Sequence, residues 1–250
     1  MKKRLKIILP ILAVILVIAG GIAMVITEPL RAMRPLETGL VFENYFIPIF
    51  ALRSGRGNLF LIDTGEGYLM IDAGNDVDSV QAGLWDLRIE WHHIKWILLT
   101  HTHGDHVGAL PMFRSAEVDG FDVEVYMSRD EFPELSANDA PGPTRGLAKN
   151  VRLLSDGEKL VFGNVEVECI AAPGHTAGSM VYLADGRYLF TGDALRYSNE
   201  KVSVHPFTQN KAQAVESIAA LPNAMSALTS HYGLFSPPWS SVSFLAPPNP

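Results

Sequence analysis

The chain has 250 residues, of which 48% are hydrophobic and 19% charged, and its net charge is −7 at neutral pH. Four basic residues precede a long apolar N-terminal run, so the remainder carries a net charge of −11, which repels phosphate backbones and argues against nucleic acid as a partner. About 220 residues follow the run, enough to bury one sizeable core. We expect a small-molecule substrate, and the composition leaves the oligomeric state open.

The first predicted element is the apolar run IILPILAVILVIAGGIAMVI, which holds 20 uncharged residues at positions 7–26. A helix of this length matches a hydrocarbon core of roughly 30 Å and predicts a transmembrane anchor. The basic flank before it places the following domain outside the cytoplasm by the positive-inside rule. We therefore divide the chain into a cytoplasmic flank and single-pass anchor at residues 1–30 and a folded domain at residues 31–250.

A cleaved signal peptide is the alternative, and it would release the domain as a secreted protein. Signal peptides usually have an apolar region of about 7–15 residues followed by a small-x-small cleavage site. Here the small residues AGGIA lie inside the apolar run, which favours the uncleaved anchor. The single cysteine, Cys169, excludes an internal disulfide, and the alternating stretch VEVECIAA predicts a buried thiol on a strand.

Strands and one helix are predicted over the first half of the domain. ENYFIPIFALRSGRGNLFLID indicates two strands with a turn at residues 54–58, and a further turn at residues 64–67 leads to the strand YLMIDAG. Apolar spacing predicts a helix over residues 76–89, which Asp76 can cap. IKWILLT is typical of a strand buried on both faces, and VGALPMF after it predicts the start of a helix.

The second half is dominated by further strands. VEVYMS predicts one strand, and the Pro and Gly content of SANDAPGPTRG predicts an irregular loop. Paired strands are predicted at KLVFG with VEVECIA and at SMVYLAD with GRYLFTGD. An amphipathic helix is expected over residues 211–221, a short strand at MSALTS, and an irregular Pro-rich tail over residues 236–250.

The stretch THTHGDHVGA, residues 100–109, holds three of the chain's eight histidines within six positions. Imidazole is a frequent metal ligand, and the stretch lies where a buried strand passes into a helix, the place where open α/β sheets position their sites. His175 in APGHTAGS, Asp193 in FTGDAL and His231 in LTSHYG each follow a strand-like run in the same way. Together these residues predict one metal site.

These motifs resemble those of the metallo-β-lactamase superfamily, in which HxHxDH is followed by a later His, an Asp and a final His. The stretches NLFLIDTGEGYLMIDAG, ILLTHTHGDHVGAL, PGHTAGS and LFTGDAL support the resemblance, which covers residues 40 to about 235. The resemblance implies an α/β (α+β) fold, a four-layer αββα sandwich with two metal ions at one edge. Here the sandwich would follow one transmembrane helix.

Carried over residue by residue, the resemblance assigns the ligands in two sets joined by a bridge. His101, His103 and His175 would bind the first metal, Asp105, His106 and His231 the second, and Asp193 both. Nitrogen and oxygen ligands without thiolate suit zinc, although iron or manganese accept the same set. We expect two divalent ions, with zinc preferred for an exported protein.

Two such ions lower the pKa of a shared water and polarise the bond that it attacks. Asp105 is predicted to orient this metal-bridging hydroxide. For Asp72 the resemblance implies that it orients a ligand histidine, and a plain turn aspartate is the alternative. Gly104, Gly174 and Gly192 are expected to serve sharp strand exits, where the absence of a Cβ helps.

Four further side chains have weaker predictions. Tyr232 follows the last predicted ligand, and its hydroxyl can donate a hydrogen bond to a developing oxyanion, the alternative being a tyrosine packed on the other side of its strand. His205 in VSVHPF is interpreted as an ordinary loop histidine, the alternative being a residue of a pocket wall, which the segment after Asp193 often forms in the superfamily. His92 and His93 are interpreted as solvated loop residues between the first helix and the next strand, and metal ligands are the alternative.

The predicted function is a membrane-anchored metal-dependent hydrolase that cleaves an ester, thioester, lactone or amide bond of a small molecule. Asp193 at the bridging position makes the site resemble that of the glyoxalase II group. Only 19 residues follow His231, so no glutathione-binding helical domain is expected. The alternatives are a β-lactam hydrolase and, from another class, a non-catalytic metal-binding or interaction module. A flavin-coupled redox site ranks lowest, because it calls for a carboxylate in place of one histidine of the first cluster.

Overall fold

The computed structural model describes residues 33–42, 47–115, 122–138 and 142–235. The predicted anchor and the Pro-rich tail lie outside these residues and stay predictions. Among the described residues, no helix is long and apolar enough to cross a membrane. From Arg34 onward the described residues belong to one compact unit.

The first sheet has seven strands in the order β1 to β7. Its first four strands form an antiparallel meander, and the later strands add in parallel, from β4 through β5 and β6 to β7. The strands are β1 (Gly39–Phe42), β2 (Ile49–Ser54), β3 (Gly57–Asp63), β4 (Tyr68–Ile71), β5 (Ile94–Leu99), β6 (Glu124–Ser128) and β7 (Val151–Leu154).

The second sheet has six strands in the order β15-β14-β11-β10-β9-β8. Only β11 and β14 pair in parallel. The strands are β8 (Lys159–Phe162), β9 (Val165–Ala171), β10 (Met180–Ala184), β11 (Tyr188–Gly192), β14 (Ser226–Thr229) and β15 (Leu234–Phe235). A separate hairpin joins β12 (Arg196–Ser198) to β13 (Lys201–Ser203).

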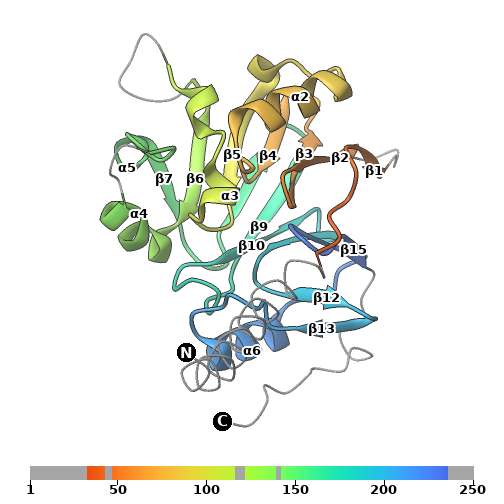
Figure 1. Ribbon diagram of the computed structural model, residues 1–250, viewed down its shortest axis with the longest axis vertical. Helices are drawn as coiled ribbons and strands as arrows, with labels where there is room; N and C mark the ends of the chain where they lie inside the picture. Colours follow the sequence, from red (N-terminus) through yellow and green to blue (C-terminus); the bar gives the residue numbers. More distant parts are fainter. Residues whose placement is uncertain (1–32, 43–46, 116–121, 139–141, 236–250) are drawn as a thin grey trace, which may run out of the picture. The chain divides into compact units, whose positions relative to one another are not determined.

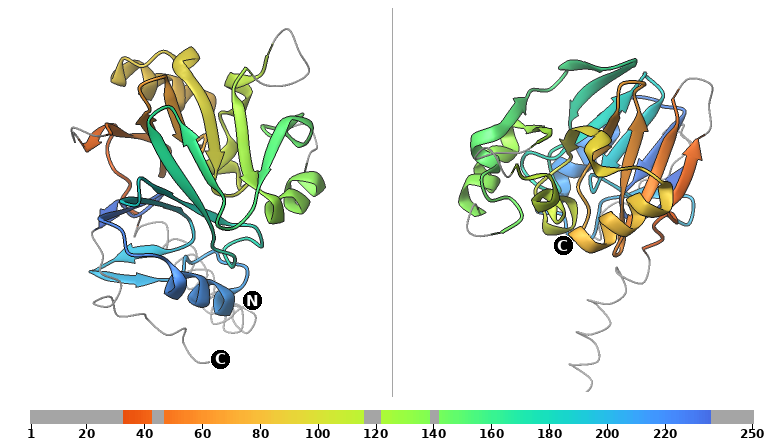
Figure 2. Two further views of the ribbon diagram at one scale, coloured as in Figure 1. Left: turned by 180° about the vertical axis from the view of Figure 1, so that it is seen from behind. Right: turned by 90° about the horizontal axis from the view of Figure 1, so that it is seen from above.

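Apolar side chains between the two sheets form the central core. Phe60 of the first sheet contacts Phe190 of the second, with ring centroids 5.4 Å apart. A second cluster packs α2 (Val77–Leu87) on the outer face of the first sheet, and a third packs α6 (Lys211–Ala220) on the outer face of the second. These layers form the predicted αββα sandwich, which Figure 1 shows from the front and Figure 2 from behind and from above.

Side-chain caps in the local sequence account for where the two long helices begin. The Asp76 side chain caps α2 by accepting a hydrogen bond from Ser79 N, as predicted, and Asn210 caps α6 in the same way. The remaining helical segments are short and lie in the connections between strands. They are η1 (Trp91–His93), α3 (Gly104–Val107), η2 (Leu110–Phe113), η3 (Arg129–Glu131), α4 (Phe132–Asn138) and α5 (Leu147–Asn150).

The helix predicted from VGALPMF is interrupted. Helix α3 ends at Val107 because the N–H groups of Gly108 and Ala109 donate to the carbonyl oxygens of Gly74 and Ala73 instead of continuing the helix. The short helix η2 then begins anew, with a proline in its first turn. The predicted loop SANDAPGPTRG begins within α4, because its first three residues contain neither Pro nor Gly and extend that helix to Asn138.

The prediction for the three strand-exit glycines holds for two of them. Gly174 and Gly192 have φ values of +136° and +51°, and a Cβ on Gly192 would lie 2.5 Å from Thr100 Oγ1. The prediction is wrong for Gly104, because its φ is not positive and a Cβ there would meet nothing within 4 Å. The turn into α3 therefore does not require a residue without a side chain.

Alanine substitutions should separate these two kinds of glycine. Gly192→Ala should lower the free energy of unfolding by about 2 kcal/mol or more, because it adds a left-handed strain to a steric clash. Gly104→Ala, the matched control between His103 and Asp105, should change the free energy of unfolding by less than about 0.5 kcal/mol. Urea denaturation of the metal-free proteins measures both values. Equal losses in the two variants would contradict the assignment.

Candidate metal centre

Loops at the carboxyl ends of β5, β9, β11 and β14 bring the predicted ligands to one edge of the sandwich. Most of these side chains are buried, whereas His103 is half-buried and Asp105 is exposed. The structure thus brings together all seven predicted ligand residues, which are His101, His103, Asp105, His106, His175, Asp193 and His231.

Three imidazoles form the first set. His103 Nδ1 lies 3.0 Å from His101 Nε2 and 3.0 Å from His175 Nε2. Two atoms bound to one zinc ion at about 2.0–2.2 Å are separated by no more than about 4.4 Å, so this spacing suits a shared ion. On its far side, His101 Nδ1 lies 3.2 Å from Thr100 Oγ1, which leaves Nε2 facing the other two rings.

Asp105, His106 and His231 form the second set. His231 Nε2 lies 3.3 Å from Asp105 Oδ2, and His106 Nε2 lies 3.9 Å from Asp105 Oδ1. A hydrogen bond of Nδ1 fixes the orientation of each ring: His231 Nδ1 donates to the carbonyl oxygen of Arg56, and His106 Nδ1 donates to Asp72. Both Nε2 atoms consequently face the cluster.

Asp193 lies between the two sets. Its Oδ1 is 3.3 Å from His231 Nε2 and 3.7 Å from His106 Nε2, whereas its Oδ2 is 3.6 Å from His175 Nε2. One carboxylate oxygen therefore faces each set, as the predicted bridging role requires.

Unpaired buried atoms show that this arrangement fits metal ions. His106 Nε2 and Asp193 Oδ1 are buried without a hydrogen-bond partner among the described residues. Leaving such atoms unpaired costs about 1–3 kcal/mol each, and more for a charged group. Nitrogen and carboxylate donors that converge in this way suit a divalent cation, and the cluster can hold two.

The two sets differ in their pKa values. Burial lowers the pKa of His101 well below its usual range and the pKa of His175 to about 3. Burial also opposes the charged forms of His106 and His231, but nearby carboxylates outweigh it. Asp72 and Asp193 hold the pKa of His106 well above normal, and Asp193 and Asp105 raise that of His231 to about 10.

Asp72 supports the second set from the end of β4. It is buried, adopts a φ of +63°, and accepts hydrogen bonds from Thr100 N at 2.8 Å and from Thr100 Oγ1. Its other contact is His106 Nδ1 at 2.8 Å. Asp72 thus contacts a predicted ligand, as the resemblance implies, and its hydrogen bonds to Thr100 and His106 are long-range contacts rather than those of a plain turn aspartate.

Sequence reasoning missed Glu131, which is fully buried in η3. Its Oε1 accepts hydrogen bonds from the backbone N and the hydroxyl of Thr102, and its Oε2 accepts one from Thr176 Oγ1. Glu131 thereby joins the loop of His101 and His103 to the loop of His175. A carboxylate after the strand VEVYMS was the only signal in the sequence, and nothing distinguished it from the neighbouring Asp130.

The weaker candidates differ in their distance from the cluster. His92 and His93 are exposed in η1, as predicted, and His92 Nε2 pairs with Glu90 at 2.9 Å. Tyr232 is buried beside His205, with ring centroids 5.8 Å apart. His205 departs from its prediction as an ordinary loop histidine, because its side chain is buried against Asp193.

The fold and the cluster define a two-sheet α/β protein with a candidate dinuclear metal centre. The family model that describes the metallo-beta-lactamase superfamily matches residues 52–231 of the sequence, so the chain belongs to this superfamily.

The chain spans about half the length of the curated relatives that it matches. The hydroxyacylglutathione hydrolase of Xanthomonas axonopodis pv. citri is 30% identical over 163 residues, which cover 65% of this chain and 51% of that protein. The "Probable polyketide biosynthesis zinc-dependent hydrolase PksB" of Bacillus subtilis is 29% identical over 127 residues, 51% of this chain and 49% of that protein.

Solved structures share the fold. A B3 metallo-beta-lactamase with an active-site glutamic acid aligns with a TM-score of 0.59 and 22% identity, covering 82% of this chain and 85% of that one. The archaeal superfamily protein ST1585 from Sulfolobus tokodaii aligns with a TM-score of 0.54 and 22% identity, covering 75% and 81%.

Metal uptake should release protons. In the metal-free chain the raised pKa values keep His106 and His231 protonated at neutral pH, and a ligand imidazole must be neutral. Metal affinity should therefore rise with pH through the neutral range, as His106 and His231 lose their protons more easily. Calorimetric titration at pH 7 in two buffers of different ionisation enthalpy measures the protons released. Identical apparent binding enthalpies in the two buffers would contradict this coupling.

Proposed function

We propose that the chain is a dinuclear metal-dependent hydrolase that cleaves an ester, thioester, lactone or amide bond of a small molecule. The observation that carries the proposal is the Asp193 carboxylate, which presents one oxygen to each of two ligand sets built without thiolate. The names of relatives support it, because they include a zinc-dependent hydrolase and a hydroxyacylglutathione hydrolase.

Bound divalent ions would supply Lewis-acid polarisation of the scissile carbonyl and a water of lowered pKa. The chain's own residues hold the geometry for this chemistry. Asp72 and the Arg56 carbonyl fix the rings of His106 and His231, so that neither has to reorient during the reaction. The Asp105 side chain is 42% exposed, and its contact with His231 helps hold its pKa well below the usual range. Asp105 therefore remains a carboxylate that can accept a hydrogen bond from the attacking water.

We also propose a role for Tyr232 at the substrate carbonyl. Its hydroxyl is buried and has no hydrogen-bond partner among the described residues. Burial raises the pKa of Tyr232 to about 12, so the hydroxyl stays protonated at neutral pH and remains a donor. We assign it the donation of a hydrogen bond to the oxyanion that forms as the carbonyl is attacked.

Hydrolysis and metal content should be measured on one preparation. We expect about two metals per chain and turnover of one member of a panel of p-nitrophenyl ester, thioester, lactone, amide and β-lactam substrates. Chelation should abolish turnover. His101→Ala should reduce it by at least about 100-fold, because loss of a ligand exceeds the roughly 10–100-fold cost of losing an outer partner.

His93→Ala is the matched control, because His93 is exposed outside the cluster. It should retain wild-type metal content and rate. Full activity in His101→Ala would overturn the site. Near-zero metal after purification with zinc, together with no turnover, would favour a non-catalytic module, and turnover of the β-lactam alone would select the alternative enzyme.

We also propose that the apolar run at residues 7–26 anchors the chain in a membrane with the hydrolase domain on the extracytoplasmic side. The support is the length and charge pattern of the run. An intact chain should sediment with membranes and resist a carbonate wash, whereas a variant lacking residues 2–30 should remain in the supernatant. A soluble wild-type product shorter by about 25–30 residues would instead show a cleaved signal peptide.

A further inference from the structure

We propose that His205 is a further protein ligand of the metal centre, on the side where Asp193 Oδ2 faces His175. The proposal rests on the metal centre of the proposed function and is independent of which bond the enzyme cleaves. Neither the sequence pattern nor the family resemblance makes this residue a metal ligand.

His205 reaches the cluster on a loop that is attached to a predicted ligand loop. It follows β13 and precedes α6, and its side chain is only 2% exposed. Gln209 N donates to the carbonyl oxygen of His175, and Asn210 N donates to that of Gly174. These two backbone hydrogen bonds fix the loop of His205 against the loop of His175.

The distances place His205 in the pattern of the predicted ligands. His205 Nε2 lies 3.6 Å from Asp193 Oδ2, which equals the 3.6 Å between His175 Nε2 and the same oxygen. This separation is too long for a hydrogen bond. It is within the limit of about 4.4 Å for two atoms that share one ion. His175, Asp193 and His205 together can hold a metal ion.

Unsatisfied nitrogens argue against a purely structural role. Neither Nδ1 nor Nε2 of His205 has a hydrogen-bond partner among the described residues. A buried histidine retained for packing normally satisfies at least one ring nitrogen, since the large majority of buried side-chain polar atoms are paired. His106 Nε2 and Asp193 Oδ1 share this unpaired state, so His205 resembles the predicted ligands rather than a core residue.

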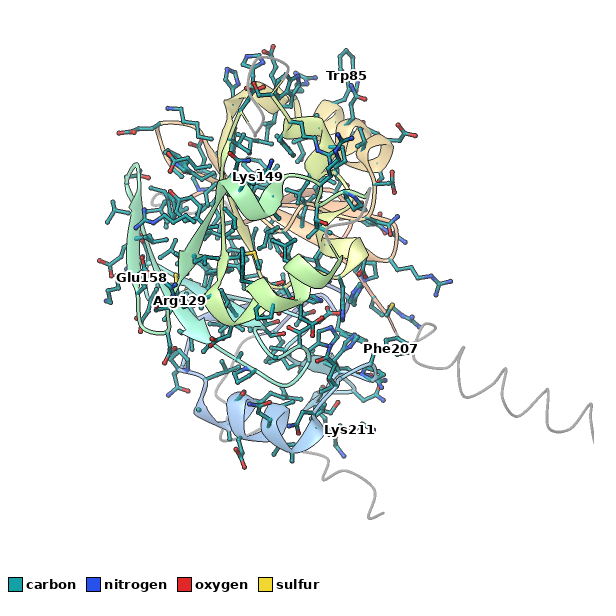
Figure 3. The ribbon with its side chains drawn as sticks, turned by 90° about the vertical axis from the view of Figure 1, so that its left-hand side faces the viewer. Trp85, Arg129, Lys149, Glu158, Phe207 and Lys211 are labelled. Atoms are coloured by element: carbon teal, nitrogen blue, oxygen red, sulfur yellow. The ribbon has the colours of Figure 1, made fainter. Side chains whose placement is uncertain are left out.

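The surroundings of His205 leave Asp193 as its nearest charged group. Around it lie the rings of His175, His231 and Tyr232, with centroids 4.9, 5.8 and 5.8 Å away. Phe207, labelled in Figure 3, is 50% exposed and lies 5.7 Å from the His205 ring. A metal ion held beside Asp193 would satisfy the imidazole of His205.

Metal binding by the whole chain tests the proposal without a substrate. His205→Ala and His205→Gln are compared with wild type and with His93→Ala, the matched histidine control. Competition with a chromophoric chelator measures the Zn²⁺ and Co²⁺ affinities, and X-ray absorption counts imidazole ligands. We expect both His205 variants to weaken one of the two sites at least about 10-fold and to lose one imidazole, while His93→Ala matches wild type.

Thermal unfolding separates this result from misfolding. Both metal-free His205 variants should still unfold in one cooperative transition, yet zinc should raise their Tm less than that of wild type. Two tightly bound metals and an unchanged imidazole count in both variants would overturn the role of His205 alone. Absence of metal from wild type would overturn the centre itself and with it the proposed function.

Discussion

A buried carboxylate at the end of β11 is the constraint on which the rest of this edge depends. Asp193 is almost fully buried, and an isolated charge in such a position would be strongly unfavourable. His175, His205 and His231 approach it from three loops, and His106 approaches it from a fourth. Positive charge, whether from protonated imidazole or from a metal ion, is therefore required where these loops meet, and the loops are shaped to deliver it.

The two sheets are held together at this same edge. Tyr182 of β10 donates a hydrogen bond to the carbonyl oxygen of Leu99, and Met180 N donates to that of Thr100. Thr100 in turn donates to Asp72 and lies directly against Gly192, where no Cβ would fit. Contacts between the two sheets thus fix the C-terminal ends of β5 and β11. The ligand loops that follow these strands are short, and their first residues are held in place by the sandwich.

Much of this arrangement could be predicted from the sequence, because its signals are local. The apolar run of β5 is buried on both faces, with Leu98 in the core between the sheets and Leu99 in the cluster beneath α2, and the HxHxDH stretch follows it directly. Short strands such as β1, β7 and the β12–β13 hairpin carry too few residues for a clear pattern. Glu131 and His205 were missed for another reason. Glu131 is buried by contacts with Thr102 and Thr176, which lie 29 and 45 residues away, and His205 is buried against Asp193. The local sequence pattern around either residue does not show these contacts.

The hydrogen bonds of Glu131 have a consequence for how the centre is filled. Because this carboxylate ties Thr102 to Thr176, the loops of the first ligand set are joined by the protein alone. The entropy of bringing these loops together is then lost during folding rather than when an ion arrives. Such a preorganised template lets ions exchange without unfolding, so the metal bound in a cell would depend on local supply as well as on intrinsic affinity.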